Sequence, residues 1–493
     1  MTIYIDDHPF HYETENLVRL FFPNEKLTTV SDIPNQPEMP YILTSMKINR
    51  QNATAYISAD VCIGEFHRFS DVELDTDTED FEKTAERTMA VCLYRLLCQY
   101  SGKEQPWGIL TGVRPIKLFR RLAEKNGEEY AKNYFQNELL VSNEKTELSA
   151  LTEQYERKIL SLSQPMSYSL YVSIPFCPTR CSYCSFVSQT VEKTKKLVQP
   201  YFELLCKELE FTATIAKEKG LKLESVYIGG GTPTTLNAEQ LSVLIKTIQS
   251  KFDMSSCREF TIEAGRPDTI NEEKLYAIYN GGIDRISINP QTLNDKVLEV
   301  IGRKHTAQQT LDAYRLAKKI GFKHINMDII AGLPTETTES FINTVDRLCE
   351  LDPASITVHT LALKRSSRLT LNGKGVNTDS GSFAAEMLAY CEKKLTQCGY
   401  HPYYLYRQTR MEGNLENVGW SKDGFDGIYN VFVMDETHTI LGCGAGAVTK
   451  LKVPASEELT RIFNYKYPYE YINGFEEMLN RKEQVRTFYD ELS

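Results

Sequence analysis

Short apolar runs and longer amphipathic segments alternate along the middle of the chain. Each run has the length and composition of a covered parallel strand, and each amphipathic segment repeats its apolar residues every three or four positions, as a helix does. Six such units are expected, with strands and their terminal turns at residues 169–176, 225–234, 259–267, 285–291, 324–334 and 355–363. This order predicts an α/β fold built on a partial (β/α)6 barrel, with the active site at the carboxyl ends of the strands.

Residues 1–160 follow a different pattern, which predicts an N-terminal α+β accessory domain. Strands are expected at residues 3–7, 41–48 and 54–66, and helices at residues 81–100 and 146–162, together with a helix that begins after the turn at Gly112 and Pro115. The segment Leu110–Pro115 is explained most simply as a turn with a helix-starting proline, although a specific role stays open.

The last part of the chain is less regular. A helix is expected over residues 379–399, strand-like and glycine-rich pieces at 400–410, 427–435 and 437–448, and helices with many aromatic residues over 463–493. These aromatics either cover a flat apolar substrate or belong to the core. The predicted domains are therefore an accessory domain at 1–160, a barrel at 165–365 and a C-terminal α+β extension at 366–493 that covers the substrate.

Composition narrows the classes of function. The chain has 493 residues and a formal net charge of −10, which argues against broad nucleic-acid binding because that requires a basic face. No stretch is long and apolar enough to span a membrane, and the first residues lack the basic and apolar regions of a signal peptide. We therefore expect a cytoplasmic protein without a nucleic-acid partner.

Three cysteines carry the clearest chemical signal. Cys177, Cys181 and Cys184 follow the first barrel strand in the spacing C-x3-C-x2-C. Three thiolates can hold three irons of a four-iron cluster and leave the fourth iron open for catalysis. Structural zinc is disfavoured because no fourth Cys or His lies nearby, and a disulfide is disfavoured in a reducing compartment. The other nine cysteines show no ligand spacing and are expected to be packing residues.

Further polar and glycine residues are predicted at or just past the strand ends. The turn Gly229–Thr234 is not a P-loop, because no Gly-Lys-Ser/Thr follows, but its glycines would let backbone groups approach a ligand. Each other candidate taken alone could be a surface charge or a loop residue, and only the shared location favours a site. These candidates are Glu263, Gln291, Arg303 and Asp328.

Five segments together resemble the oxygen-independent coproporphyrinogen III oxidases, which are radical S-adenosylmethionine (radical SAM) proteins. The segments are YVSIPFC, CPTRCSYC, GGGTPT, the pair NPQ and IGRKH, and NMDIIAGLP. The long N-terminal part and the segment EGNLENVGW resemble the HemZ branch. The resemblance implies a radical SAM barrel that oxidatively decarboxylates two propionates of coproporphyrinogen III to vinyl groups, giving protoporphyrinogen IX.

The resemblance also implies the cofactors and their residues. One [4Fe-4S] cluster would be held by Cys177, Cys181 and Cys184, with one or two molecules of SAM beside it. Positions that match contacts of the cluster-bound SAM are Tyr171, Gly230, Glu263, Ala362 and Val448. Positions that match contacts of a second SAM are Tyr183, Gly231, Thr232, Gln291, Arg303 and Asp328. The implied partners are a tetrapyrrole substrate and a reducing electron donor of the flavodoxin or ferredoxin type.

The sequence departs from the family pattern at two positions. Phe186 stands where the best-studied members of the family carry a fourth cysteine; the related haem chaperones also have Phe at this position. Ser173 stands where the best-studied members carry a histidine. The chaperones also carry a motif His-Asn-x-x-Tyr-Trp, of which this chain has only Asn417-Val-Gly-Trp420. A haem chaperone and radical SAM chemistry on another tetrapyrrole therefore stay open beside decarboxylation.

The substrate of the implied reaction carries four propionates, which would need paired cations in the site. The candidates are Arg266, Arg365, Arg407 and Arg410, of which at least one is expected to bind the substrate, whereas the resemblance assigns Arg303 to SAM. Lys304 and His305 are expected to be loop residues, and Phe186 is expected to pack beside the cluster.

Overall fold

The protein is described by a computed structural model that covers residues 1–184, 188–362, 380–408, 411–454 and 456–492. The chain forms two compact units, which we treat separately. The first contains Met1–Ala150 and Arg407–Leu415, and the second contains Leu151–Tyr406 and Glu416–Ser493. The boundary predicted at residue 365 lies outside the described residues, and the three predicted domains stay a prediction.

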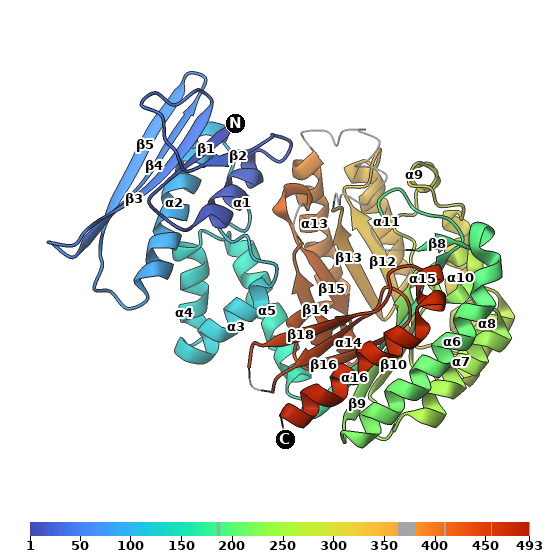
Figure 1. The fold of residues 1–493 in the computed structure, drawn as a ribbon. Coiled ribbons are helices and arrows are strands. Elements are labelled where there is room, and N and C mark those ends of the chain that lie inside the picture. Colours follow the sequence, from blue (N-terminus) through green and yellow to red (C-terminus); the bar gives the residue numbers. More distant parts are fainter. Residues whose placement is uncertain (185–187, 363–379, 409–410, 455, 493) are drawn as a thin grey trace. The chain divides into compact units, whose positions relative to one another are not determined.

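The first unit is built on a five-stranded sheet in the order β2-β1-β3-β4-β5, drawn in blue in Figure 1. Its strands are β1 (Thr2–Asp6), β2 (Thr28–Val30), β3 (Tyr41–Asn49), β4 (Thr54–Ile63) and β5 (Phe66–Asp75). Its helices are α1 (His11–Phe21), α2 (Phe81–Ser101), α3 (Pro115–Asn126), α4 (Glu128–Asn133), the π-helix η1 (Tyr134–Glu138) and the first part of α5 (Asn143–Leu160), up to Ala150. The predicted strand 54–66 is three residues too long, because the chain turns at Gly64 with a φ of +59°. Strand β5 begins at Phe66 and was not predicted, because its sequence is polar and mostly exposed.

The second unit contains the predicted barrel sheet. Six parallel strands lie side by side in the order β13-β12-β11-β10-β9-β6. They are β6 (Ser167–Ile174), β9 (Lys222–Gly230), β10 (Glu259–Glu263), β11 (Arg285–Ser287), β12 (His324–Ala331) and β13 (Ser355–Thr360). The helices that connect them are α6 (Val191–Glu218), α7 (Ala238–Lys251), α8 (Glu272–Asn280), α9 (Asp295–Val300), α10 (Ala307–Ile320) and α11 (Thr338–Leu351). The predicted partial barrel is confirmed.

Later strands extend both edges of this sheet to eleven strands. On one side β15 (Asn417–Ser421) pairs antiparallel with β13, and β14 (His401–Tyr406) pairs with β15. On the other side β16 (Thr439–Cys443) runs parallel to β6 and is followed by β17 (Val448–Lys452) and β18 (Leu459–Phe463). The remaining helices are α13 (Ser380–Gln397), α14 (Ile428–Asp435), α15 (Pro468–Asn473) and α16 (Phe475–Glu491). Since α14 contacts both β9 and β14, which are far apart in the sheet order, the sheet curves around this helix.

The prediction of a strand-like piece at residues 427–435 is wrong, because these residues form α14. Their β-branched and aromatic side chains favour strands locally. The helix is stabilised from another element: the Glu259 carboxylate of β10 accepts the backbone N–H of Ile428 at 2.7 Å and of Tyr429 at 3.4 Å. A negative charge at a helix N-terminus satisfies otherwise unpaired N–H groups. This contact could not be predicted from the sequence near residue 427, because Glu259 lies 169 positions before Ile428.

None of the helices in the described ranges combines the length and the apolar character that crossing a bilayer needs.

Candidate functional site: a cysteine loop at the carboxyl end of the barrel

The three cysteines lie on a loop that follows β6. Cys177 ends the short strand β7 (Phe176–Cys177), which pairs in parallel with β8 (Gln189–Thr190) and so brings the two ends of the loop together. Inside the loop the backbone N–H of Cys184 donates to the carbonyl of Cys181 at 3.3 Å. Residues 185–187 lie outside the described part, so the packing predicted for Phe186 stays a prediction.

The segment that follows α9 is hydrogen-bonded to this loop. The Ser182 N–H donates to the Ile301 carbonyl at 2.9 Å, and the Thr179 hydroxyl donates to the Gly302 carbonyl at 3.0 Å. The motif Ile301–His305, which follows α9, is therefore joined directly to the cysteine loop.

The glycine-rich turn after β9 is pressed against the strand that leads into the loop. The N–H groups of Gly231 and Thr232 donate to the carbonyls of Ile174 at 2.8 Å and Phe176 at 2.7 Å. A Cβ at Gly231 would lie 2.6 Å from the Phe176 carbonyl oxygen, and Gly230 has a φ of +103°. The hydroxyl of Thr232 lies 3.5 Å from the Cys177 sulfur. Glycine is thus required here by the close approach of β6 and β7, besides any approach of a ligand.

We expect Gly231→Ala to destabilise the protein by about 1–3 kcal/mol and to lower the iron content, because both carbonyls that crowd the new methyl belong to backbone and cannot swing away. The measurements are the urea midpoint and iron per chain after anaerobic reconstitution. Gly112→Ala is the control, since its Cβ would meet only Leu110 Cδ1, at 4.0 Å. Wild-type stability and iron content in Gly231→Ala would contradict this explanation of the turn.

Glu263 closes β10 beside this turn. Tyr227 of β9 donates its hydroxyl to Glu263 Oε1 at 2.6 Å. Desolvation raises the pKa of Glu263 to about 7, the hydrogen bond from Tyr227 opposes the shift, and the charge of Asp328 adds to it. The carboxylate is therefore an acceptor for a ligand's hydroxyl or amino group, and it changes charge near neutral pH.

The predicted contact between Glu263 and SAM would make SAM affinity depend on pH. Ionised Glu263 would attract the cationic ligand and accept strong hydrogen bonds, whereas the protonated form is neutral and a weaker acceptor. With a pKa of about 7, affinity should fall about tenfold from pH 8 to pH 6, because the competent fraction falls by that factor. Calorimetric titration of the reconstituted protein measures it. Glu263→Gln should bind more weakly and lose this part of the pH dependence; an identical pH profile in both proteins would remove Glu263 from the SAM site.

Tyr183 and Arg303 join the cysteine loop to the fourth strand unit. Arg303 is buried and donates to the Asn289 carbonyl at 2.6 Å and to the Tyr183 hydroxyl at 3.2 Å. Burial raises the pKa of Tyr183, so its hydroxyl keeps its proton. The buried Nε of Arg303 has no hydrogen-bond partner among the described residues, which suits an acceptor on a bound ligand.

Gln291 is held in a strained backbone conformation next to β12. Its φ is +66°, its N–H donates to the Asp328 carbonyl at 2.9 Å, and its carbonyl accepts from Ile330 at 3.0 Å. These two bonds stabilise a conformation that a non-glycine residue rarely adopts. The Asp328 side chain accepts from Asn326 Nδ2 at 2.7 Å.

The remaining candidates are more widely placed. Tyr171 lies inside β6, with its ring 6.3 Å from the rings of Tyr227 and Tyr429. Ala362 follows β13, and Val448 begins β17. The expectation that every candidate lies at or past a strand end is wrong for Tyr171 and Asp328, which lie within β6 and β12.

The surroundings of Cys181 suit an anionic group. Arg266 Nη1 lies 3.7 Å from the Cys181 sulfur, and the positive charge of Arg303 also interacts with this thiol. Both guanidinium groups are buried, and Asp268 is the carboxylate that pairs with Arg266. Buried positive charge beside the Cys181 sulfur favours binding of an anionic group such as a cluster. Among the described residues no three His, Cys, Asp or Glu side chains converge as ligands of one metal ion; in a four-iron cluster each thiolate binds a different iron.

Two of the candidate arginines have partners within the protein, and their contact with a substrate stays a prediction. Arg266 contacts Asp268, Thr179 and Cys181. Arg407 belongs to the first unit, where it donates to the Leu110 carbonyl at 2.5 Å and lies over the Trp107 ring. The turn at Leu110–Pro115 thus has a role in holding this returning segment. Arg365 and Arg410 lie outside the described residues.

Sequence reasoning also missed two members of the site. His305 lies in the loop between α9 and α10, as predicted, but its side chain is buried and its Nδ1 lies 3.8 Å from Asp268 Oδ1. Asp268 was not singled out at all. The only signal in the sequence was the unusual run Arg266-Pro-Asp268 directly after a strand, at the edge where the site was expected.

Comparisons with known proteins identify the superfamily and several relatives. Residues 171–348 match the radical SAM superfamily. The oxygen-independent coproporphyrinogen-III oxidase-like protein HemZ of Bacillus subtilis is 35% identical over 97% of this chain and 96% of its own length. The haem chaperone HemW of Haemophilus influenzae is 31% identical over 62% of this chain and 76% of its own length.

A solved structure gives the same fold. Coproporphyrinogen III oxidase (HemN) from Escherichia coli, described as a radical SAM enzyme, matches with a TM-score of 0.51 and 24% identity, over 66% of this chain and 73% of that one. The near full-length match to HemZ, the superfamily match and the three-cysteine loop agree with one another. The chain therefore belongs to the radical SAM family of oxygen-independent coproporphyrinogen III oxidase-like proteins, in its HemZ-like branch.

Proposed function

We propose that the protein is an oxygen-independent coproporphyrinogen III dehydrogenase. It would convert two propionates of coproporphyrinogen III to vinyl groups and release protoporphyrinogen IX. The observation that carries this proposal is that the turn containing Gly230, a position that matches a contact of the cluster-bound SAM, touches the cysteine loop. In this turn the Thr232 N–H donates to the Phe176 carbonyl at 2.7 Å, and the Thr232 hydroxyl lies 3.5 Å from the Cys177 sulfur. Cleavage of SAM requires cluster and SAM to be neighbours, and these contacts support that arrangement.

The residues present fit the cofactors that the family implies. Cys177, Cys181 and Cys184 would hold one [4Fe-4S] cluster, and Glu263, Gly230 and the strand ends near Ala362 and Val448 would hold SAM. When bound, this pair would supply the radical chemistry that removes a hydrogen atom from the propionate β-carbon, after which loss of carbon dioxide and of one electron to an acceptor would leave a vinyl group. A second SAM would lie against Tyr183, Gly231, Thr232, Gln291, Arg303 and Asp328.

The chain's own residues would prepare the site for this chemistry. Burial at Tyr183 and Tyr227 raises the pKa of both phenols, so each stays protonated. The Tyr227 hydroxyl donates to Glu263, and the Tyr183 hydroxyl accepts from Arg303. A reductant of the flavodoxin or ferredoxin type would supply the electron, and Arg365 and Arg410 remain the candidates for pairing with propionates.

A haem chaperone is the second candidate, because HemW relatives share the barrel. In this chain the segment that resembles the chaperone motif is a core strand. Asn417–Ser421 forms β15, all five residues are buried, and Asn417 Oδ1 accepts the Thr360 N–H at 2.9 Å. The motif's histidine is also absent from the sequence at this place. These observations favour the enzyme.

Two assays on one preparation separate the candidates. The anaerobically reconstituted protein is incubated with SAM, a reductant and coproporphyrinogen III, and a second sample is titrated with haem. The enzyme should form protoporphyrinogen IX and bind haem weakly. Stoichiometric haem binding without turnover would favour the chaperone. SAM cleavage stimulated only by another tetrapyrrole would show that this tetrapyrrole, and not coproporphyrinogen III, is the substrate.

A further inference from the structure

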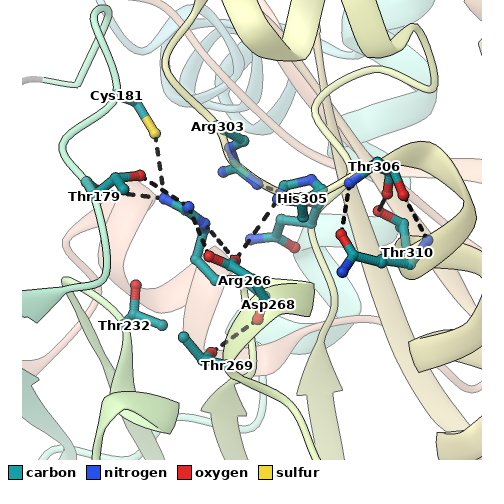
Figure 2. A network of polar contacts seen from close by, with 12 residues as sticks. Thr179, Cys181, Thr232, Arg266, Asp268, Thr269, Arg303, His305, Thr306 and Thr310 are labelled. Carbon is teal, nitrogen blue, oxygen red and sulfur yellow. Dashed lines mark hydrogen bonds and ion pairs between the residues drawn. The ribbon is translucent and has the colours of Figure 1, made fainter.

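Arg266 is the most completely engaged side chain near the cysteine loop. Its Nε and Nη2 donate to the two carboxylate oxygens of Asp268, at 3.0 and 3.1 Å. Its Nη2 also donates to the Thr179 hydroxyl at 2.9 Å, and its Nη1 points to the Thr179 carbonyl at 3.4 Å and to the Cys181 sulfur at 3.7 Å. Figure 2 shows the guanidinium between Cys181 and Asp268.

The position of Arg266 is fixed by its own turn. It precedes the 3₁₀ turn η3 (Pro267–Thr269), in which the Thr269 hydroxyl donates to the Arg266 carbonyl at 2.8 Å. The same hydroxyl lies 2.6 Å from that of Thr234 in the glycine-rich turn. The Lys274 ammonium donates to the carbonyls of Thr234 at 2.6 Å and Thr269 at 3.1 Å. The two turns that approach the cysteine loop are therefore joined to each other.

His305 lies next to Asp268, the carboxylate that pairs with Arg266. It lies beside Asp268 in Figure 2, its side chain is fully buried, and both ring nitrogens lack a hydrogen-bond partner in the described part of the chain. Burial and the charges of Arg303 and Arg266 lower the pKa of His305, which favours its neutral form. Arg266 is therefore the cation that pairs with the Asp268 carboxylate. Burial opposes ionisation of Asp268, but contacts with His305 and Arg266 lower its pKa overall, which keeps the pair ionised.

We propose that Arg266 is a positioning residue that donates an N–H to the Cys181 sulfur and thereby raises the reduction potential of the cluster. This inference rests on the three-cysteine cluster of the proposed function. Hydrogen bonds to cluster sulfurs and nearby charge set the potential, because they stabilise the more negative, reduced state. Asp268 fixes the direction of the guanidinium through a bidentate pair, which a lysine cannot reproduce.

The test is a redox titration of the reconstituted protein, followed by electron paramagnetic resonance without substrate. In Arg266→Met, the ratio of reduced to oxidised cluster at a fixed potential should fall about tenfold, which is a lowering of about 59 mV for one electron. Arg266→Lys keeps the charge and should lie between Arg266→Met and wild type. Arg315→Met is the control, since Arg315 is exposed and pairs only with exposed Asp312 among the contacts described for it.

The outcomes separate this inference from the proposed function. A wild-type potential in Arg266→Met at full iron content would overturn the inference, even if wild-type protein decarboxylates coproporphyrinogen. If Arg266→Met takes up no iron, the potential of Arg266→Lys is measured instead, and a wild-type value at full iron content would overturn the inference. A lowered potential in Arg266→Met, together with no coproporphyrinogen turnover by the wild-type protein, would support the inference and rule out coproporphyrinogen III as the substrate. Wild-type protein that assembles no four-iron cluster would overturn both.

Discussion

Cys181→Ala should abolish both the iron–sulfur cluster and SAM cleavage. Cys181 is the buried member of the three, and Arg266 and Arg303 surround its sulfur with positive charge. Each thiolate of a three-cysteine site binds a different iron, so losing one ligand opens a second iron and exposes the cluster to loss. The same result is expected for Cys177→Ala and Cys184→Ala.

Iron per chain, the visible absorption of the reconstituted protein and the yield of 5′-deoxyadenosine measure this effect. Cys206→Ala provides a matched control, because Cys206 lies on α6 and takes no part in the loop. It should keep full iron content and SAM cleavage. A Cys181→Ala protein that still cleaves SAM would show that the loop does not hold the reactive cluster.

Lys482→Met should cost about 3–5 kcal/mol of stability, because it leaves a buried carboxylate without its cation. The Lys482 ammonium of α16 lies 3.0 Å from Glu208 Oε1 of α6, and both side chains are almost completely buried. It also donates to the Gly442 carbonyl at 2.6 Å. Glu208 in turn accepts from the Gly444 N–H at 2.7 Å, so the pair holds the glycine-rich segment between β16 and β17, just before Val448.

The sequence offers a direct reporter for this loss. The chain has two tryptophans, Trp107 in the first unit and Trp420 in the second, and both are buried. In a Trp107→Phe background, the fluorescence of Trp420 during urea unfolding follows the unit that contains Lys482. Arg315→Ala in the same background should cost less than about 1 kcal/mol, because its ion pair is exposed.

A second substitution separates the ion pair from simple packing. Glu208→Gln combined with Lys482→Met should recover part of the loss, since no buried charge then remains unpaired. A cost below about 1 kcal/mol for Lys482→Met alone would contradict the ion-pair account.

The parts of the fold that were predictable depend on local signals. The six parallel strands followed from short apolar runs, and the start of α7 followed from Asn237, whose side chain accepts the Gln240 N–H at 2.8 Å. Contacts between distant segments were not predictable. Glu259 stabilises α14, and β16 joins β6, because residues about 170 and 270 positions apart meet in space.

The candidate site shows the same division. The spacing of Cys177, Cys181 and Cys184 is local, so the sequence alone predicts the loop. The direction of Arg266 depends on Asp268, His305 and Thr179 together, and an arginine at a strand end looks equally suited to a substrate carboxylate. Only the structure shows that its guanidinium is already occupied by the loop and Asp268.

In the proposed reaction, a radical that the cluster and SAM would supply removes a hydrogen atom from the propionate β-carbon of coproporphyrinogen III. The most direct measurement uses substrate deuterated at those carbons, incubated anaerobically with the reconstituted protein, SAM and a reductant, and follows both products by mass spectrometry. The account predicts deuterium in 5′-deoxyadenosine together with a tetrapyrrole that has lost two molecules of carbon dioxide. Unlabelled 5′-deoxyadenosine with intact coproporphyrinogen would contradict it.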